Sequence, residues 1–128
     1  MRTIVTICLA IIILALVMVG GGCSPKNTVI VGLAPIHDIS ITLLKSKPPQ
    51  VNVHIQGGLA DGCTTFHDIQ TTREGTTITL KVTTQRPKDA ICTEIYTIFE
   101  KDINLGSNFT IGQVYTVKVN DQTANFTY

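Results

Sequence analysis

Residues 76–84 read Thr-Thr-Ile-Thr-Leu-Lys-Val-Thr-Thr, and this stretch decides the fold class. Its apolar residues, Ile78, Leu80 and Val82, alternate with threonine and lysine. Successive side chains of a β-strand point to opposite faces of a sheet. The alternation therefore predicts a strand with one face packed in a core and the other face in water.

The same alternation recurs at residues 51–56 and 115–119, and the β-branched residues that suit a pleated surface are abundant. Turn-forming residues separate the segments, as at Pro48-Pro49 and Arg73-Glu74-Gly75. We expect an all-β fold, an immunoglobulin-like β-sandwich of seven to eight strands over residues 28–128, with a small barrel as the alternative. The expected strands are Thr28–Ala34, Asp38–Lys45, Gln50–Gln56, Asp68–Arg73, Thr76–Thr84, Cys92–Lys101, Val114–Asn120 and Ala124–Tyr128.

The start of the chain has the pattern of an export signal. Arg2 is followed by an uncharged apolar run, Ile4–Val19, and then by three glycines and Cys23. A basic start, an apolar stretch and a small-residue site are typical of a secretory signal. The end of this segment resembles the lipobox of prokaryotic lipoproteins, with Gly21 and Gly22 in its small positions. The resemblance implies that residues 1–22 form a signal peptide and residues 23–27 a tether lipidated at Cys23.

Two other interpretations of this segment stay open, an uncleaved membrane anchor and an ordinary secretory signal. A spanning helix needs about 20 apolar residues, and residues 3–22 reach that length only with three glycines included. In the lipidated and the uncleaved cases the rest of the chain lies outside, because Arg2 favours the cytoplasmic side. We expect a protein anchored in the cell membrane or outer envelope, with its domain facing away from the cytoplasm.

Composition excludes several function classes. Removing residues 1–22 leaves 106 residues with nine basic and nine acidic side chains, hence no formal net charge. A neutral domain lacks the basic surface that binds nucleic acid. The glycine pair Gly57-Gly58 is followed by neither a helix nor a lysine, so it does not form a phosphate-binding loop. We expect no cofactor.

The four cysteines differ in their surroundings. Cys8 lies inside the apolar run and Cys23 is the expected lipid acceptor. Two cysteines then remain in an exported domain, Cys63 and Cys92, and we expect them to form a disulfide. The bond would join the loop at residues 57–63 to the start of a strand, and closing about 30 residues stabilises a fold by about 3–4 kcal/mol.

Other chemistry at these residues is less consistent with the sequence. Cys63 and His67, with Asp68 beside them, could form a thiolate–imidazole pair or half of a metal site. Such a pair needs a free thiol, which a bond to Cys92 would remove. We therefore expect neither a catalytic residue nor a bound metal.

Two further patterns carry weaker signals. Asp61, Asp68 and Asp89 could group around calcium, but their spacing matches no calcium loop. Asn108 and Asn125 each begin an Asn-x-Thr sequon and are possible glycosylation sites.

Several short motifs follow one another between Val51 and Tyr128. They are Asp61-Gly62-Cys63, Arg73-Glu74-Gly75, Asp89-Ala90-Ile91-Cys92 and Tyr115-x-Val117-x-Val119-Asn120. This order is similar to an uncharacterised, disulfide-containing domain of exported prokaryotic lipoproteins and surface proteins. The sequence departs from that pattern at Ala60, where the domain has Pro, and at Asp121, where it has Gly. The resemblance implies the sandwich and the disulfide, and it implies no activity.

The expected function is a non-enzymatic binding or structural module at the cell envelope, with the membrane and an unidentified protein or surface as partners. The alternative is a surface protease inhibitor or accessory subunit that acts through its end loops. In either case we expect the functional surface to be the loop cluster of residues 57–67 and 85–92, which the disulfide would hold rigid.

Overall fold

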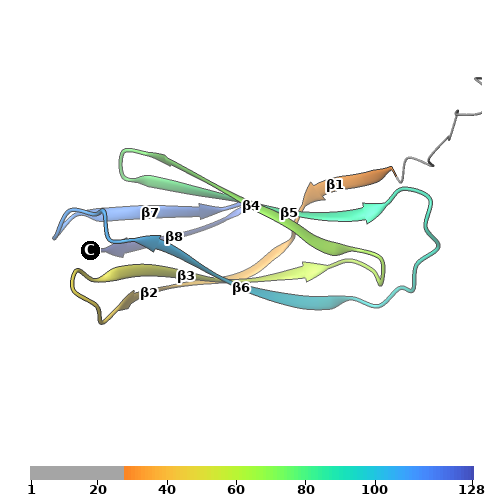
Figure 1. The fold of residues 1–128 in the computed structure, drawn as a ribbon, viewed down its shortest axis with the longest axis horizontal. Helices are drawn as coiled ribbons and strands as arrows, with labels where there is room; N and C mark the ends of the chain where they lie inside the picture. The colour runs from red at the N-terminus through yellow and green to blue at the C-terminus, as the bar shows by residue number, and fades with distance from the viewer. Residues whose placement is uncertain (1–27) are drawn as a thin grey trace, which may run out of the picture.

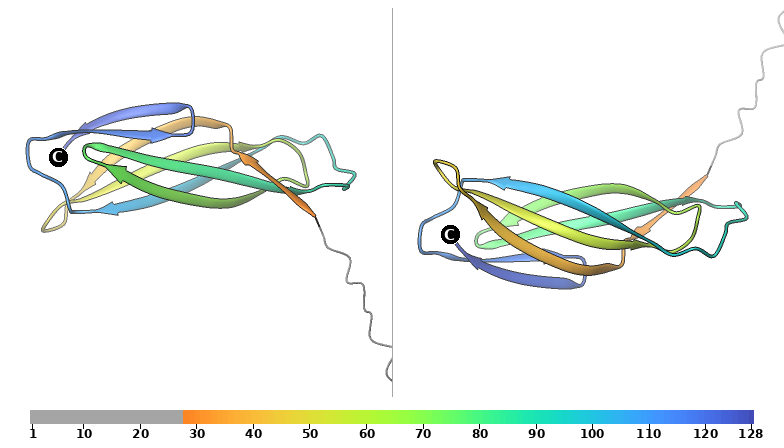
Figure 2. Two further views of the ribbon diagram at one scale, coloured as in Figure 1. Left: turned by 90° about the horizontal axis from the view of Figure 1, so that it is seen from above. Right: turned by 90° about the horizontal axis from the view of Figure 1, so that it is seen from below.

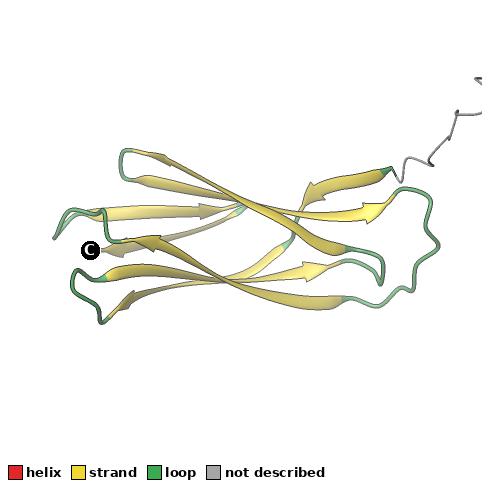
Figure 3. Ribbon diagram, in the orientation of Figure 1, coloured by secondary structure: helices red, strands yellow, loops and turns green. Residues whose placement is uncertain are grey.

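The computed structural model describes residues 28–128, which form two stacked β-sheets (Figure 1). The strands are β1 (Val29–Leu33), β2 (Ile36–Leu44), β3 (Gln50–Leu59), β4 (Thr65–Glu74), β5 (Thr77–Pro87), β6 (Thr97–Gly106), β7 (Val114–Val119) and β8 (Gln122–Thr127). This part of the chain has no helix (Figure 3), and so it contains no helix able to cross a membrane. The predicted all-β sandwich is confirmed. The predicted signal peptide, tether and lipidation site at residues 1–27 lie outside the described residues.

The larger sheet has five strands and the smaller has three. In the smaller sheet β3 lies between β2 and β6, and both pairings are antiparallel. In the larger sheet β5 pairs antiparallel with β4 along one edge. Its other edge is shared end to end by β1, which runs antiparallel, and β7, which runs parallel and leads on to β8. The parallel pairing of β5 with β7 is a feature that alternation alone did not predict.

The core fills the space between the two sheets. Every second residue of β3, β5 and β7 points into it, as the alternation predicted, because these strands expose only their other face to water. The fully buried side chains are Val51, Val53, Ile55, Ile78, Leu80, Val82, Val117 and Val119.

Asn120 closes the gap where β1 and β7 meet on β5. Its Oδ1 accepts a hydrogen bond of 2.9 Å from the Val82 N–H, and its Nδ2 donates to the carbonyl oxygens of Ala34 at 2.7 Å and Val82 at 2.9 Å. The backbone of Asn120 has a φ of 51°, in the left-handed region that asparagine tolerates better than most residues. The side chain therefore continues the hydrogen-bond ladder between two strands that are not joined to each other.

Several predicted strand boundaries were wrong. β4 begins at Thr65 and not at Asp68, β5 ends at Pro87 and not at Thr84, and two further differences lie near the disulfide. Residues 57–59 belong to β3, not to a loop, and β6 begins at Thr97, so Cys92 lies in a loop. Gly57 and Gly58 lie within β3 because aromatic rings occupy the space that a side chain would need at these two positions. A Cβ on Gly57 would lie 2.4 Å from the Phe99 ring, and a Cβ on Gly58 would lie 1.6 Å from the Tyr96 hydroxyl oxygen. These glycines therefore serve close packing within a strand.

The sandwich is elongated, and most of its loops gather at two ends, while the β1–β2 connection and the β7–β8 turn lie between them (Figure 2). We call one the disulfide end; it contains the start of β1, the β3–β4 loop at residues 60–64 and the β5–β6 loop at residues 88–96. The opposite end contains the β2–β3 and β4–β5 turns and the segment at residues 107–113. We call it the aromatic end, after the side chains described below.

Candidate functional site

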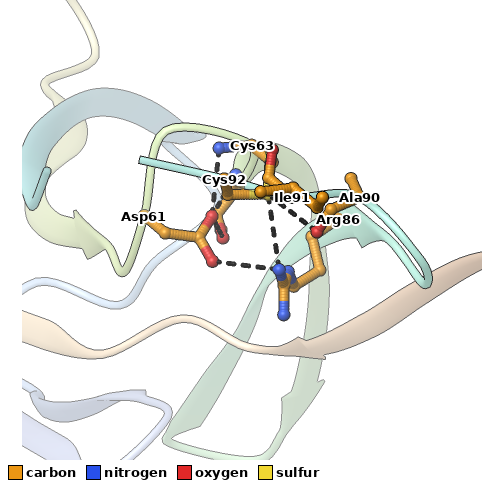
Figure 4. Close-up of a disulfide and its surroundings, with 7 residues drawn as sticks. Asp61, Cys63, Arg86, Ala90, Ile91 and Cys92 are labelled. Atoms are coloured by element: carbon orange, nitrogen blue, oxygen red, sulfur yellow. Dashed lines mark hydrogen bonds and ion pairs between the residues drawn. A yellow bond between two sulfur atoms is a disulfide. The ribbon is translucent and has the colours of Figure 1, made fainter. Parts of the chain in front are cut away.

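The Cys63–Cys92 disulfide joins the β3–β4 loop to the β5–β6 loop (Figure 4). The two Cα atoms are 5.5 Å apart, which is an ordinary separation for a disulfide. The predicted bond is confirmed, with the correction that it links two loops and not a loop and a strand. The backbone reinforces it, because the Gly62 N–H donates to the Thr93 carbonyl oxygen at 2.9 Å.

Asp61 organises the loop beside the disulfide. Its Oδ1 accepts hydrogen bonds from the Thr64 hydroxyl at 2.7 Å, the Thr64 N–H at 2.8 Å and the Cys63 N–H at 3.0 Å. Its Oδ2 lies 3.3 Å from Nη2 of Arg86, which reaches over from β5 (Figure 4). The hydrogen bond from the Thr64 side chain is the main reason that the pKa of Asp61 lies below its usual value. The carboxylate therefore acts as a structural acceptor that fixes the turn.

The described residues at the disulfide end do not form the thiolate–imidazole pair or the metal site that Cys63 and His67 could have formed. Among residues 28–128 one group, Asp61, Cys63 and Cys92, has its potential donor atoms within 4.8 Å of one another. Both sulfurs of that group are oxidised, so neither is the thiolate that a metal ligand or nucleophile requires. His67 and Asp68 are exposed on β4, next to a register shift, and they do not join the group.

Two shallow hollows lie along β1. One, of about 190 Å³, is lined mainly by β1 and by the ends of β3 and β5, including Ile30, Gly58 and Arg86. The other, of about 260 Å³, lies beside Asn120 and Leu33. Both are smaller than the 300–1,000 Å³ typical of sites for small molecules.

Sequence reasoning missed a polar ladder on the outer face of the smaller sheet. His54 Nδ1 lies 3.1 Å from Asp102 Oδ1, and Asn52 Nδ2 donates to the same oxygen at 3.1 Å. The hydrogen bond from His54 is the main reason that the pKa of Asp102 lies below its usual value. Cross-strand pairs on either side extend the ladder, namely Gln50 with Asn104 and Gln56 with Glu100.

Ser40 stands opposite His54 in the strand register, so β2, β3 and β6 place a serine, a histidine and an aspartate in one row. No hydrogen bond joins Ser40 to His54 in the described structure. Backbone N–H groups of a sheet point along the sheet, not out of its face, so they cannot converge on an oxyanion above this row. Only the β3–β6 pairing brings His54 to Asp102, and the residue pattern does not reveal that pairing.

The aromatic end is closed by packed rings. Phe109 lies 5.0 Å from Tyr115, 5.5 Å from Phe126 and 5.3 Å from Tyr128, measured between ring centroids. The guanidinium carbon of Arg73 lies 4.6 Å from the Phe109 centroid, in cation–π geometry. The hydroxyl of Tyr128 donates to the Pro49 carbonyl oxygen at 2.8 Å and so ties this cluster to the β2–β3 turn.

The two sequons are on the surface. Asn108 lies next to the partly buried Phe109 in the segment at residues 107–113, and Asn125 lies on β8. Both asparagine side chains are exposed. Their modification stays a prediction.

Comparison with known proteins gives a family. Residues 53–128, from the middle of β3 to Tyr128, match the ORF11 beta-sandwich domain. The "Uncharacterized 10.2 kDa protein in HgiCIIM 5'region" of Herpetosiphon aurantiacus is 43% identical over 86 residues, 67% of this chain and 90% of the relative. The "Uncharacterized 10.2 kDa protein in HgiBIM 5'region" of the same organism is 49% identical over 76 residues, 59% of this chain and 92% of the relative. No solved structure matches the chain significantly. The chain belongs to the family of the ORF11 beta-sandwich domain.

Proposed function

We propose that the chain is a lipid-anchored protein of the cell envelope that presents its β-sandwich outside the membrane as a non-enzymatic binding or structural module. The observation that carries the proposal is Cys23, which stands directly behind two small residues and an apolar run, five residues before Thr28. The Cys63–Cys92 disulfide supports it, because structural disulfides belong mainly to oxidising compartments outside the cytoplasm.

The absence of an assembled reaction centre in residues 28–128 supports a module without catalysis. Catalysis needs a nucleophile held by a base, or a metal with several ligands. Here Cys63 and Cys92 are bonded to each other, and Ser40 makes no hydrogen bond to His54. A function on the outer surface is more consistent with this arrangement than a reaction in a pocket.

The test compares three full-length proteins expressed in a bacterial host that processes lipoproteins: the natural chain, Cys23→Ser and Cys8→Ser. Each is separated into membrane and soluble fractions and analysed by intact mass. The natural chain and Cys8→Ser should be membrane-bound, lack residues 1–22 and carry acyl mass. Cys23→Ser should carry no acyl mass and should be unprocessed or released.

Cys8→Ser is the matched control, because it removes a cysteine from the apolar run without touching the proposed acceptor. A membrane-bound natural chain that keeps residues 1–22 and carries no acyl group would refute lipidation in favour of an uncleaved anchor. A natural chain that is cleaved and recovered only in the soluble fraction would refute anchoring altogether.

A further inference from the structure

Large apolar side chains are exposed at the disulfide end more than elsewhere on the described surface. On the β5–β6 loop, Ile91 is fully exposed and Ile95 is mainly exposed. Tyr96 is half-exposed, and its hydroxyl group is hydrogen-bonded to the His37 side chain on β2. All of β1 is exposed as well. The large apolar residues exposed on β1, on the β5–β6 loop and at the start of β6 are Val29, Ile30, Val31, Leu33, Ile91, Ile95, Tyr96 and Ile98, against Leu43, Leu44, Ile111 and Val114 elsewhere on residues 28–128.

The described chain also begins at this end. The carbonyl oxygen of Thr28 accepts a hydrogen bond of 2.9 Å from the Lys88 N–H, so Thr28 lies beside the base of the β5–β6 loop. Cys23 precedes Thr28 by five residues, which reach at most about 18 Å when fully extended. A lipid on Cys23 therefore keeps this end of the sandwich close to the bilayer surface.

The β5–β6 loop is held in place. The disulfide fixes Cys92, the Gly62 N–H binds the Thr93 carbonyl oxygen, and Arg86 at the end of β5 pairs with Asp61. Little conformational freedom is then lost when the loop binds a surface. The loop has one basic residue, Lys88, and two acidic ones, so its attraction to lipid is apolar, not electrostatic.

We infer that the β5–β6 loop, residues 88–96, docks on the bilayer that holds the lipid on Cys23. Ile91 and Ile95 enter the boundary between head groups and acyl chains, and Tyr96 lies at the level of the head groups, where an amphipathic ring is favoured. This inference rests on the proposed lipid anchor. It also disfavours a protease inhibitor acting through this loop, because the loop faces the membrane and not the surrounding solution.

The absence of tryptophan from the chain allows a direct test. Ile91→Trp places a single fluorescent probe in the loop, and Ile111→Trp places a matched probe at the aromatic end, where Ile111 is also strongly exposed. Both full-length proteins are purified from membranes and reconstituted in phosphatidylcholine vesicles with or without brominated acyl chains. The probe at position 91 should emit at shorter wavelength and be quenched at least about twofold more strongly than the probe at position 111, because insertion reaches about 5–10 Å.

The outcomes separate the two proposals. Equal quenching of both probes in a protein that floats with the vesicles would refute docking of the loop and leave the anchor standing. A natural chain that does not float would refute the anchor, and the inference with it. A probe at position 91 that is shielded but not quenched by brominated lipid would show that protein, such as a second copy, covers the loop, and would also overturn the inference.

Discussion

The two ends of the sandwich are closed in different ways. At the aromatic end Phe109 packs against three other rings and Arg73, so side-chain burial holds the loops together. At the disulfide end β1 is exposed along its whole length, and a covalent bond and the hydrogen bonds of Asp61 hold the loops instead. A covalent link thus substitutes for packing where apolar side chains remain in water.

Removing the disulfide should have the largest effect. In residues 24–128, Cys63→Ala combined with Cys92→Ala should lower the free energy of unfolding by about 3–4 kcal/mol, because the closed loop spans a sequence separation of 29 residues. Denaturant unfolding measures the loss. Hydrogen exchange should accelerate most in β1 and the β5–β6 loop; equal acceleration at the aromatic end would break the contrast between the ends.

Phe109→Ala should act at the other end. Phe109 is partly buried, so we expect a loss of about 2–3 kcal/mol, below the 3–5 kcal/mol of a fully buried phenylalanine. Phe109→Leu is the control, since it restores apolar area but not the ring contacts with Arg73 and Tyr115. Exchange should accelerate in residues 107–113 and β8 while β1 keeps its protection. Loss of protection in β1 would show that the ends are not independent.

Asn120 lies where β1 and β7 meet on β5, and removing its side chain should have a smaller effect on stability. Asn120→Ala should cost about 2 kcal/mol, because the buried Val82 N–H loses its acceptor and the positive φ disfavours alanine. Asn120→Gly also removes the side chain but accepts that φ, so it should be about 1 kcal/mol more stable than the alanine variant. Thermal unfolding measures both. Equal stability of the two variants would contradict a contribution from the backbone conformation.

Substitution of Asp61 should have the smallest effect on stability, and that effect should appear at acidic pH. The folded pKa of Asp61 is lowered, so its stabilisation is complete above the ordinary carboxyl pKa of about 3.9 and is lost as pH falls through the folded value. Asp61→Asn should therefore weaken the dependence of stability on pH in this acidic range. Asp102→Asn is the control. The hydrogen bond from His54 lowers the pKa of Asp102 on the smaller sheet, so this substitution should leave hydrogen exchange at the disulfide end unchanged. An unaltered acid profile in Asp61→Asn would contradict the role of this carboxylate.

Alternation predicted which residues enter the core, because burial of one strand face leaves a direct mark on the sequence. Val53, Leu80 and Val117 are all buried as expected. The disulfide was predictable from the surroundings of the four cysteines. Strand pairing was not, because a one-dimensional pattern does not tell a strand which neighbour it has.

The missed features depend on that pairing. His54 and Asp102 meet only because β3 lies beside β6. The glycines at 57 and 58 suggested a turn, since glycine usually marks one, whereas Phe99 and Tyr96 from the neighbouring strand and loop require the space. Asn120 likewise reads as a turn residue until β1 and β7 are known to share an edge.

The shared edge of β5 also sets an order of folding. The β2–β3 and β4–β5 hairpins pair segments that are close in sequence, so they can form early. β1 has no such neighbour, since Val29 pairs with Pro87, and the parallel edge must wait for β7. Loop closure over such separations slows folding to the range of milliseconds to seconds typical of all-β domains. β1 therefore stays unpaired until β5 is available, and the larger sheet is complete only when β7 and β8 have joined it.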